Sequence, residues 1–179
     1  MTTMKEMHAR LRHRHAMGEL ESRRPDLAFV SVSKDSLRPL LADLRDREGF
    51  THLVLLTAVD WIEDNQFQLT YLLHDRAAPR DLGVRVMLDR DNPVMDSVHD
   101  LWPTAATYQR ELREMFGIDF PDSPRLDEEF ILEGWTDKPP YRRDFDTLEY
   151  AEKTFTHRPG RETHDPATYM KQKLYPDGA

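Results

Sequence analysis

The sequence predicts an α+β fold: a small mixed or antiparallel sheet covered by helices on one face, followed by a long extended C-terminal arm. From residue 27 onward, apolar runs of β-type composition and apolar residues at helical spacing follow one another in the order β-α-β-β-β-α. Short links join the consecutive strands, and both patterns stop near residue 120. Strands joined in this way pair antiparallel, which leaves the helices on one face of the sheet.

The first two elements are a helix and a strand. Residues 4–21 are highly charged and carry a weak helical pattern, with Met4, Met7 and Leu11 on one face. The run Leu27–Ser33, LAFVSVS, has the apolar and β-branched composition of a short strand. We therefore expect the chain to begin with a helix and then enter the sheet.

A second helix follows. Its apolar residues recur at i, i+3, i+4 and i+7: Leu37, Leu40, Leu41 and Leu44. Asp35 or Ser36 is suited to cap its start, and Gly49 is suited to end it. Pro39 fits this helix only near the first turn, because proline lacks the N–H that later turns require.

Three strand candidates come next in the chain: His52–Val59, Phe67–His74 and Gly83–Leu88. The polar residues 63–65 separate the first two candidates, and residues 77–79 separate the last two. We expect these strands to be neighbours in the sheet.

The best-defined helix of the sequence lies between Pro103 and Gly117. Proline is tolerated in a first helical turn, and glycine is common just after a helix ends. One face of this helix is apolar: Ala105, Tyr108, Leu112, Met115 and Phe116. The charged residues lie off that face, and Arg110 and Glu114 have the spacing of an i,i+4 ion pair.

Residues 121–179 have a different character. They hold seven of the twelve prolines and eight of the seventeen aromatic residues, without a long periodic pattern. A disordered tail would be poor in aromatic residues, and a small domain cannot cover so many of them. We therefore divide the chain into an α+β domain at residues 1–120 and an extended partner-binding arm at residues 121–179. The alternative, an arm folded back on its own sheet, stays open.

The composition excludes several classes of function. The chain has 179 residues, 39% of them hydrophobic and 32% charged, a formal net charge of −8 and no cysteine. Without cysteine it forms no disulfide, no thiol nucleophile and no cysteine-ligated cluster or zinc site. The acidic net charge also argues against nucleic-acid binding, which normally needs a basic face.

No apolar run approaches the ~18 residues of a membrane-spanning helix. The basic residues near the N-terminus have no apolar run behind them, so we expect no secretory signal. These two features predict a soluble chain that reaches a membrane only through a partner.

No metal, nucleotide or catalytic site is predicted. His13 and His15 are two residues apart and face different sides of a helix, and neither H-x-x-x-H nor H-E-x-x-H occurs. The sequence contains no G-x-G, no P-loop and no G-x-S-x-G elbow.

Four segments carry a more specific pattern. Leu56–Asp60 reads LTAVD, Asp100–Gly117 reads DLWPTAATYQRELREMFG, Trp135 follows, and Pro140–Phe145 reads PYRRDF. In this order they resemble the 30-kDa subunit family of respiratory complex I, the C-type subunits of NADH-quinone oxidoreductase. In that family D-L-W-P leads into a helix reading E-R-E-x-x-D/E-M/L-F-G. A tryptophan and a P-L-R-K-D-F segment follow.

The chain departs from the family pattern at a few positions. Gln109 stands in place of the family's first glutamate, and Thr107 in place of an aromatic residue. The acidic residues 127–129 stand where the family has a basic pair. These positions lie where the family contacts its large partner subunit. They leave open whether the partner is that of complex I or that of a homologous complex.

The resemblance implies a structural and assembly subunit in the peripheral arm of an energy-converting NADH:quinone oxidoreductase. A protein of this kind binds no cofactor itself, and iron–sulfur clusters with flavin or nickel–iron belong to its partners. Those partners would be the large quinone-site or nickel–iron subunit and neighbouring cluster-bearing subunits, with no nucleic acid. The implied location is peripheral, on the cytoplasmic side of the inner (plasma) membrane, with membrane contact only through the complex.

Three alternatives are weighed against this function. The first is the equivalent subunit of a group 4 membrane-bound nickel–iron hydrogenase or related complex. The second is an unrelated soluble adaptor whose arm docks another protein. The third is a free-standing small enzyme, which would need a nucleophile and base that no motif in the sequence supplies.

The resemblance also marks residues expected at a subunit interface: Arg110, Glu111, Glu114, Phe116, Gly117, Trp135, Tyr141, Arg142, Arg143, Asp144 and Phe145. The charged residues of the helix have three interpretations: an acid–base cluster, a solvated ion-paired face, or buried pairs that fix the helix against its neighbour. The run 142–144 is either a solvated turn or a clamp that contacts partner carboxylates through the planar arginine side chains.

Overall fold

A computed structural model describes residues 3–155, 170 and 173–174. The chain divides into two compact units, Met1–Phe145 and Asp146–Ala179. In the second unit the described residues include helix α4 (Thr147–Thr154), which begins at the capping side chain of Asp146. Every residue predicted at an interface lies in the first unit, whereas much of the predicted arm lies outside the described residues.

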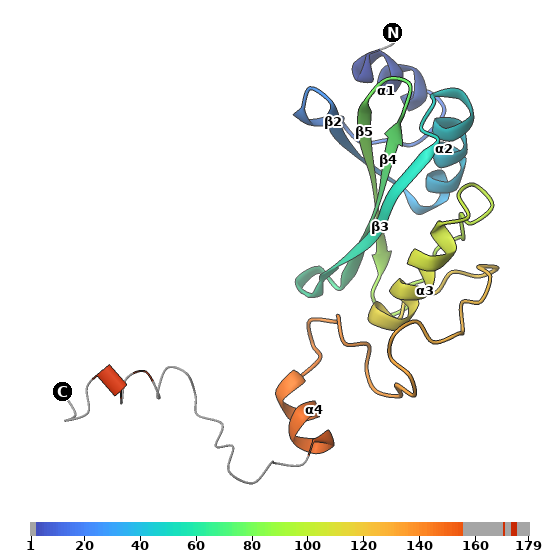
Figure 1. Cartoon of the computed structure of the whole chain (residues 1–179). Coiled ribbons are helices and arrows are strands. Elements are labelled where there is room, and N and C mark those ends of the chain that lie inside the picture. The colour runs from blue at the N-terminus through green and yellow to red at the C-terminus, as the bar shows by residue number, and fades with distance from the viewer. Residues whose placement is uncertain (1–2, 156–169, 171–172, 175–179) are drawn as a thin grey trace. The chain divides into compact units, whose positions relative to one another are not determined.

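A five-stranded mixed sheet forms the centre of the first unit (Figure 1). Its strands are β1 (Glu21–Arg24), β2 (Leu27–Val32), β3 (His52–Trp61), β4 (Gln66–Asp75) and β5 (Arg80–Asp89). Their order across the sheet is β1-β2-β5-β4-β3. β2 and β5 run parallel and all other neighbours run antiparallel. β1 and β3 are therefore the two edges.

Helices α1 (Met4–Arg12), α2 (Lys34–Arg47) and α3 (Ala105–Phe116) cover one face of this sheet (Figure 1). Burial along β4 alternates accordingly. Its fully buried hydrophobic residues are Phe67, Leu69, Tyr71 and Leu73, and the residues between them keep contact with solvent. The predicted α+β fold, with helices on one face of a small mixed sheet, is confirmed.

Two local features differ from the prediction. The first helix ends at Arg12, well before residue 21, and an unpredicted strand, β1, begins at Glu21. β1 reads ESRR and is exposed at all four positions, so no apolar alternation marks it in the sequence. Proline favours the first turn of a helix, but Pro39 lies further into α2.

The first compact unit extends to Phe145, beyond the boundary at residue 120 that the sequence predicts. We call residues 121–145 the strap. It folds back on its own domain: its backbone and charged groups form hydrogen bonds with α3 and with the end of the sheet. No sequence pattern predicts this packing, because the strap carries no periodic apolar residues. That residues 121–179 bind a partner stays a prediction.

Candidate interface around helix α3

Helix α3 buries one largely apolar face and ends at a glycine. Its buried residues are Ala105, Gln109, Leu112, Met115 and Phe116. Gly117 has φ +75°, and its N–H donates to the carbonyl of Arg113 at 3.0 Å. A Cβ at this position would lie 3.2 Å from Nη2 of Arg142 and 3.3 Å from Cγ of Pro139. The glycine therefore serves both the helix end and the close approach of the strap.

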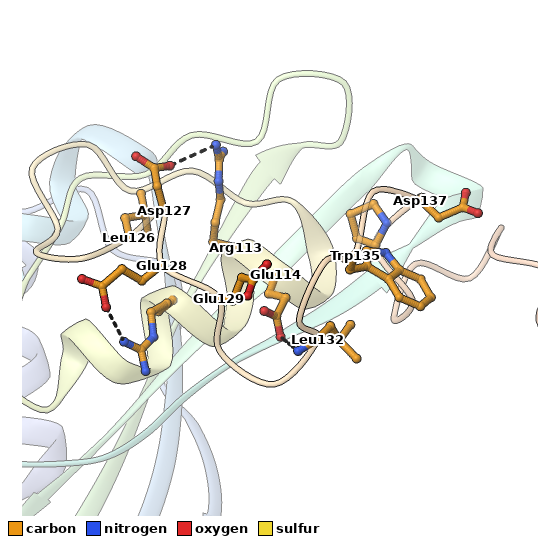
Figure 2. A pocket seen from close by; sticks show the side chains of 11 residues that line it. Arg113, Glu114, Leu126, Asp127, Glu128, Glu129, Leu132, Trp135 and Asp137 are labelled. Atoms are coloured by element: carbon orange, nitrogen blue, oxygen red, sulfur yellow. Dashed lines mark hydrogen bonds and ion pairs between the residues drawn. The ribbon is translucent and has the colours of Figure 1, made fainter.

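Glu114 holds the middle of the strap (Figure 2). Its carboxylate accepts hydrogen bonds from three consecutive backbone N–H groups, those of Phe130 at 2.6 Å, Ile131 at 2.9 Å and Leu132 at 3.1 Å. A carboxylate with three such donors is a strong anchor, because hydrogen bonds to charged groups are stronger than neutral ones. Glu114 thus fixes the turn at residues 130–132 to α3.

Arg110 does not form the i,i+4 pair with Glu114 that its spacing predicts. Its guanidinium lies over the ring of Phe130 at 5.3 Å, and its Nη1 is 3.9 Å from a carboxylate oxygen of Glu128. Its Nε is buried without a hydrogen-bond partner among the described residues. Strap residues take the place of the neighbouring glutamate, because Glu114 is already occupied by backbone donors.

The second half of the strap binds the C-terminal end of α3. The N–H of Tyr141 donates to the carbonyl of Met115 at 3.0 Å, and Nε of Arg142 donates to the carbonyl of Phe116 at 2.7 Å. These carbonyls belong to the last turn, which has no helical donors of its own. The Arg142 guanidinium also lies 5.2 Å from the ring centroid of Phe67 in the sheet. Arg142 therefore joins the strap, the helix end and the sheet.

A network of buried charges fixes the strap to the ends of the strands. Nε of Arg90 donates to Asp60 Oδ1 at 2.9 Å, and its Nη2 donates to Asp144 at 2.5 Å. The N–H of Arg143 donates to the second oxygen of Asp60 at 2.9 Å. The side chain of Asp60 is 1% exposed and that of Arg90 is 10% exposed. Removal of either group would leave the other buried without its partner.

The pKa values follow from these contacts. The hydrogen bond to Asp60, assisted by Asp144, raises the pKa of Arg90 against the opposing effect of burial. A hydrogen bond from Lys138 and then one from Arg90 lower the pKa of Asp144, again against burial. Arg90 and Asp144 are therefore charged at neutral pH, and neither is available as a neutral acid or base for proton transfer.

The remaining aromatic residues of the predicted interface meet within the strap. Trp135 packs at a tilt against Phe145, with ring centroids 5.7 Å apart, and its Nε1 donates to the carbonyl of Lys138. Tyr141 contacts Phe116 edge to face at 5.7 Å but keeps 59% of its surface exposed. Arg143 forms an exposed ion pair with Glu63, a contact of the kind that adds little stability.

Gln109, at which the sequence departs from the family pattern, lies on the buried face of α3. Its Oε1 accepts hydrogen bonds from the hydroxyl groups of Ser97 at 2.8 Å and Ser123 at 2.7 Å. Ser123 belongs to the first residues of the strap, so this buried amide ties the strap to the loop before α3. No sequence pattern indicates that contact, because the three residues lie in separate segments.

Glu111 is the exception among the predicted interface residues. It is half-buried, and it forms no hydrogen bond or ion pair with any residue that the structure describes. The other predicted residues of α3 and the strap all contact one another or their own domain. Their contact with a partner, and that of Glu111, stays a prediction.

A charged surface pocket of about 320 Å³ lies between α3 and the strap (Figure 2). Arg110 and Arg113 line it from the helix, and acidic residues at 127–129 line it from the strap. Arg113 is 3.2 Å from Asp119 and 3.7 Å from Asp127, so its charge is already compensated within the chain. In the described part of the chain no group of three potential ligands is placed to hold a metal. The arrangement is suited to holding protein segments together.

Asp60 and Arg90 were not predicted as site residues. Asp60 is the last residue of the LTAVD segment, and its place in that segment is the one sequence feature that could have marked it as a site residue. Arg90 follows β5 without any motif, and only the sheet brings it beside Asp60.

Sequence comparison identifies the family. The model of the respiratory-chain NADH dehydrogenase 30-kDa subunit matches residues 30–151. The C subunit of NADH-quinone oxidoreductase from Moorella thermoacetica is 33% identical over 120 residues, which are 67% of this chain and 80% of that protein. The C/D 2 subunit of NADH-quinone oxidoreductase from Aquifex aeolicus is 37% identical over 115 residues, which are 64% of this chain and 19% of that longer protein.

Two solved structures share the fold. A chain of the membrane-bound sulfane sulfur reductase, an archaeal respiratory membrane complex, matches with a TM-score of 0.76 and 25% identity over 89% of this chain and 98% of its own length. The trypsin-resistant fragment of Nqo5 matches with a TM-score of 0.60 and 21% identity. This match covers 68% of this chain and 97% of the fragment. The family match runs from β2 into α4 and includes the whole strap. This chain therefore belongs to the 30-kDa subunit family of respiratory-chain NADH dehydrogenases.

Proposed function

We propose that this chain is a structural and assembly subunit in the peripheral arm of an energy-converting complex of the NADH:quinone oxidoreductase type, docked on the large quinone-site subunit. The observation that carries the proposal is that two charged signature residues, Glu114 and Arg142, bind the chain's own backbone. Glu114 binds three N–H groups of the strap, and Arg142 binds a carbonyl at the end of α3. Residues used in this way build a fixed surface, and none of them is left as a nucleophile or base.

The Aquifex relative supports the choice of partner. Its name joins the C and D subunits in one protein, and the part similar to this chain is 19% of its length. Two subunits that occur in one polypeptide must lie close together. We therefore propose a D-type large subunit as the neighbour, contacted by α3 and the strap. The exposed carboxylates of residues 127–129 would meet basic groups on it.

The cofactors of the complex are assigned to other subunits. The chain has no cysteine, so any iron–sulfur cluster must have its ligands elsewhere, and flavin or nickel–iron is likewise proposed for the partners. No helix in the described residues is long and apolar enough to cross a membrane. We propose a peripheral position on the cytoplasmic side, with membrane contact through the complex.

A second candidate rests on the sulfane sulfur reductase. The sulfane sulfur reductase chain covers 89% of this chain with a TM-score of 0.76. The Nqo5 fragment covers 68% of this chain with a TM-score of 0.60. The match favours the equivalent subunit of a related membrane-bound complex, a class in which we include group 4 hydrogenases. In that case the neighbour would be the corresponding large subunit, and the role of the chain would be the same.

Affinity purification of the full chain from its own cells tests the proposal. The tagged chain should bring down a large subunit and cluster-bearing subunits in equal amounts, identified by mass spectrometry. Assays of NADH:quinone reduction, sulfane sulfur reduction and hydrogen oxidation on that complex then separate the two candidates. The chain purified alone should have no visible absorbance and no stoichiometric metal. A chain that binds its own flavin or cluster, or that brings down no large subunit, would contradict the proposal.

A further inference from the structure

The two edges of the sheet differ in how they are protected. The β1 edge is four residues long, and all four residues, three of them charged, are exposed. Charged side chains and short length are the usual means by which proteins prevent pairing at a sheet edge. The β3 edge is ten residues long, reads HLVLLTAVDW, and contains no lysine, arginine or proline. Its one carboxylate, that of Asp60, is buried in the network with Arg90, so this edge lacks the protections of β1.

Within the part of the chain that the structure describes, the backbone of β3 has no second hydrogen-bond partner along most of this edge. At its start the hydroxyl of Tyr108 donates to the carbonyl of Val54 at 2.8 Å, and a bulge lies between Leu53 and Leu55. From Leu55 to Trp61, β4 is the only described segment that hydrogen-bonds to the β3 backbone. In an antiparallel pair, alternate residues direct both their N–H and C=O groups away from the partner strand. A row of donors and acceptors therefore faces outward beyond the bulge.

Exposed apolar side chains accompany that row on the open face of the sheet. Val59 and Trp61 are each 42% exposed. Val59 lies opposite Gln68 of β4, which lies opposite Met87 of β5, and Met87 is 39% exposed. An added strand would place its own side chains beside Val59 and Trp61 and cover part of this apolar surface.

Glu111 supplies the charge on the helix side of the same edge. Tyr108 reaches the β3 backbone at Val54, and Glu111 lies one helical turn further on the same flank of α3. Glu111 is half-buried and has no hydrogen bond or ion pair among the described residues. A basic side chain on an added strand would satisfy it. A second copy of this chain is a poor occupant, because each copy carries a net charge of −8.

We propose that an extended segment of the large partner subunit pairs with β3 from Leu55 to Trp61 and adds a sixth strand to the sheet. The segment carries apolar residues toward Val59 and Trp61 and a lysine or arginine toward Glu111. Main-chain hydrogen bonds give such a complex its affinity, and alternate side chains give it specificity. The inference rests on the proposed function and adds the place and the chemistry of the contact.

Amide hydrogen exchange on the full chain, alone and in the purified complex, tests the pairing directly. The outward-facing amides of residues 55–61 should exchange rapidly in the lone chain and at least about tenfold more slowly in the complex. Protection in the lone chain that rises with concentration would identify a second copy as the occupant. Protection that is independent of concentration would identify a segment of the same chain. Either result, or rapid exchange in a complex that contains the large subunit, overturns the inference and leaves the proposed function intact.

The absence of cysteine allows a matched cross-linking experiment. Val59→Cys and Ser22→Cys each place a single thiol on an exposed position, one at each edge, for a thiol-attached photocrosslinker. In the purified complex Val59→Cys should cross-link to one segment of the large subunit that contains a basic residue, and Ser22→Cys should not. Cross-links to another subunit, or to the large subunit from both positions equally, contradict the inference. If no large subunit is present in the complex, the proposed function itself fails.

Discussion

Glu114 is the position at which the structure makes its sharpest prediction. Replacement by glutamine keeps the shape of the side chain but changes one acceptor oxygen into an NH₂ donor. In the unmodified chain Oε1 accepts from the N–H groups of Ile131 and Leu132, and Oε2 accepts from the N–H of Phe130 at 2.6 Å. In glutamine one of these two positions becomes an NH₂ donor, which would face a backbone donor. Loss of one charged hydrogen bond and weakening of the others should amount to about 2 kcal/mol.

Glu111→Gln is the matched control. It lies on the same helix, one turn earlier, and has no hydrogen bond or ion pair within the described residues. It should change the free energy of unfolding by less than about 0.5 kcal/mol. The two substitutions make the same chemical change, so any difference between them reports the contacts of Glu114 with the strap.

Amide exchange at residues 130–132 is the appropriate measurement, because the strap can open without global unfolding. An opening equilibrium shifted by about 2 kcal/mol accelerates exchange about 30-fold. Glu114→Gln should show this acceleration in the isolated chain, and Glu111→Gln should show none. Equal exchange rates at residues 130–132 in Glu114→Gln and the unmodified chain would refute the anchoring role.

Three further outcomes are expected. Gly117→Ala should lower the free energy of unfolding by about 1–2 kcal/mol, because φ is +75° and the new Cβ would press against the strap; unchanged thermal unfolding would contradict this. Deletion of residues 146–179 should leave the melting temperature nearly unchanged, whereas deletion of residues 121–179 should lower it by more than about 5 °C, and equal melting of the two would refute the packing. Hydrogen bonds from Arg38 lower the pKa of Asp100 to about 2, so their stabilisation is complete above the unfolded pKa of about 4 and is lost as the pH falls toward 2; an NMR titration midpoint near 4 would exclude it.

Periodicity was sufficient to predict most of the fold. The apolar spacing between Pro103 and Gly117 predicts α3 because a helix buried on one face requires that spacing, and the glycine at its end has the expected left-handed conformation. The candidate Phe67–His74 lies within β4, a strand buried on alternate residues. β1 was missed because a charged edge strand is held by backbone pairing alone, and backbone pairing has no signature in side-chain pattern.

The site was harder to predict, because its contacts cross long stretches of sequence. The resemblance identified Glu114, but the partners of its carboxylate are backbone N–H groups, which every residue other than proline possesses. The pair Asp60 and Arg90 is separated by 30 residues, and it forms only because β3 and β5 flank β4. The spacing of Arg110 and Glu114 suggested a local pair, but the strap offered each of them a better partner.

The predicted interface residues thus separate into two groups with different physical roles. Glu114, Arg142 and Asp144 contact their own chain, and substituting them would weaken assembly indirectly by loosening the strap. Glu111 has no hydrogen bond or ion pair among the described residues, and Tyr141 keeps 59% of its surface exposed, so we expect these two side chains to be available for contact with a partner. Stability of the isolated chain distinguishes Glu111 from the first group, because only substitutions in the first group remove contacts within the chain. Tyr141 belongs partly to both groups, since its ring also packs edge to face on Phe116. An interface inferred from sequence resemblance alone merges them, because both a buried anchor and an exposed contact constrain the residue at a position.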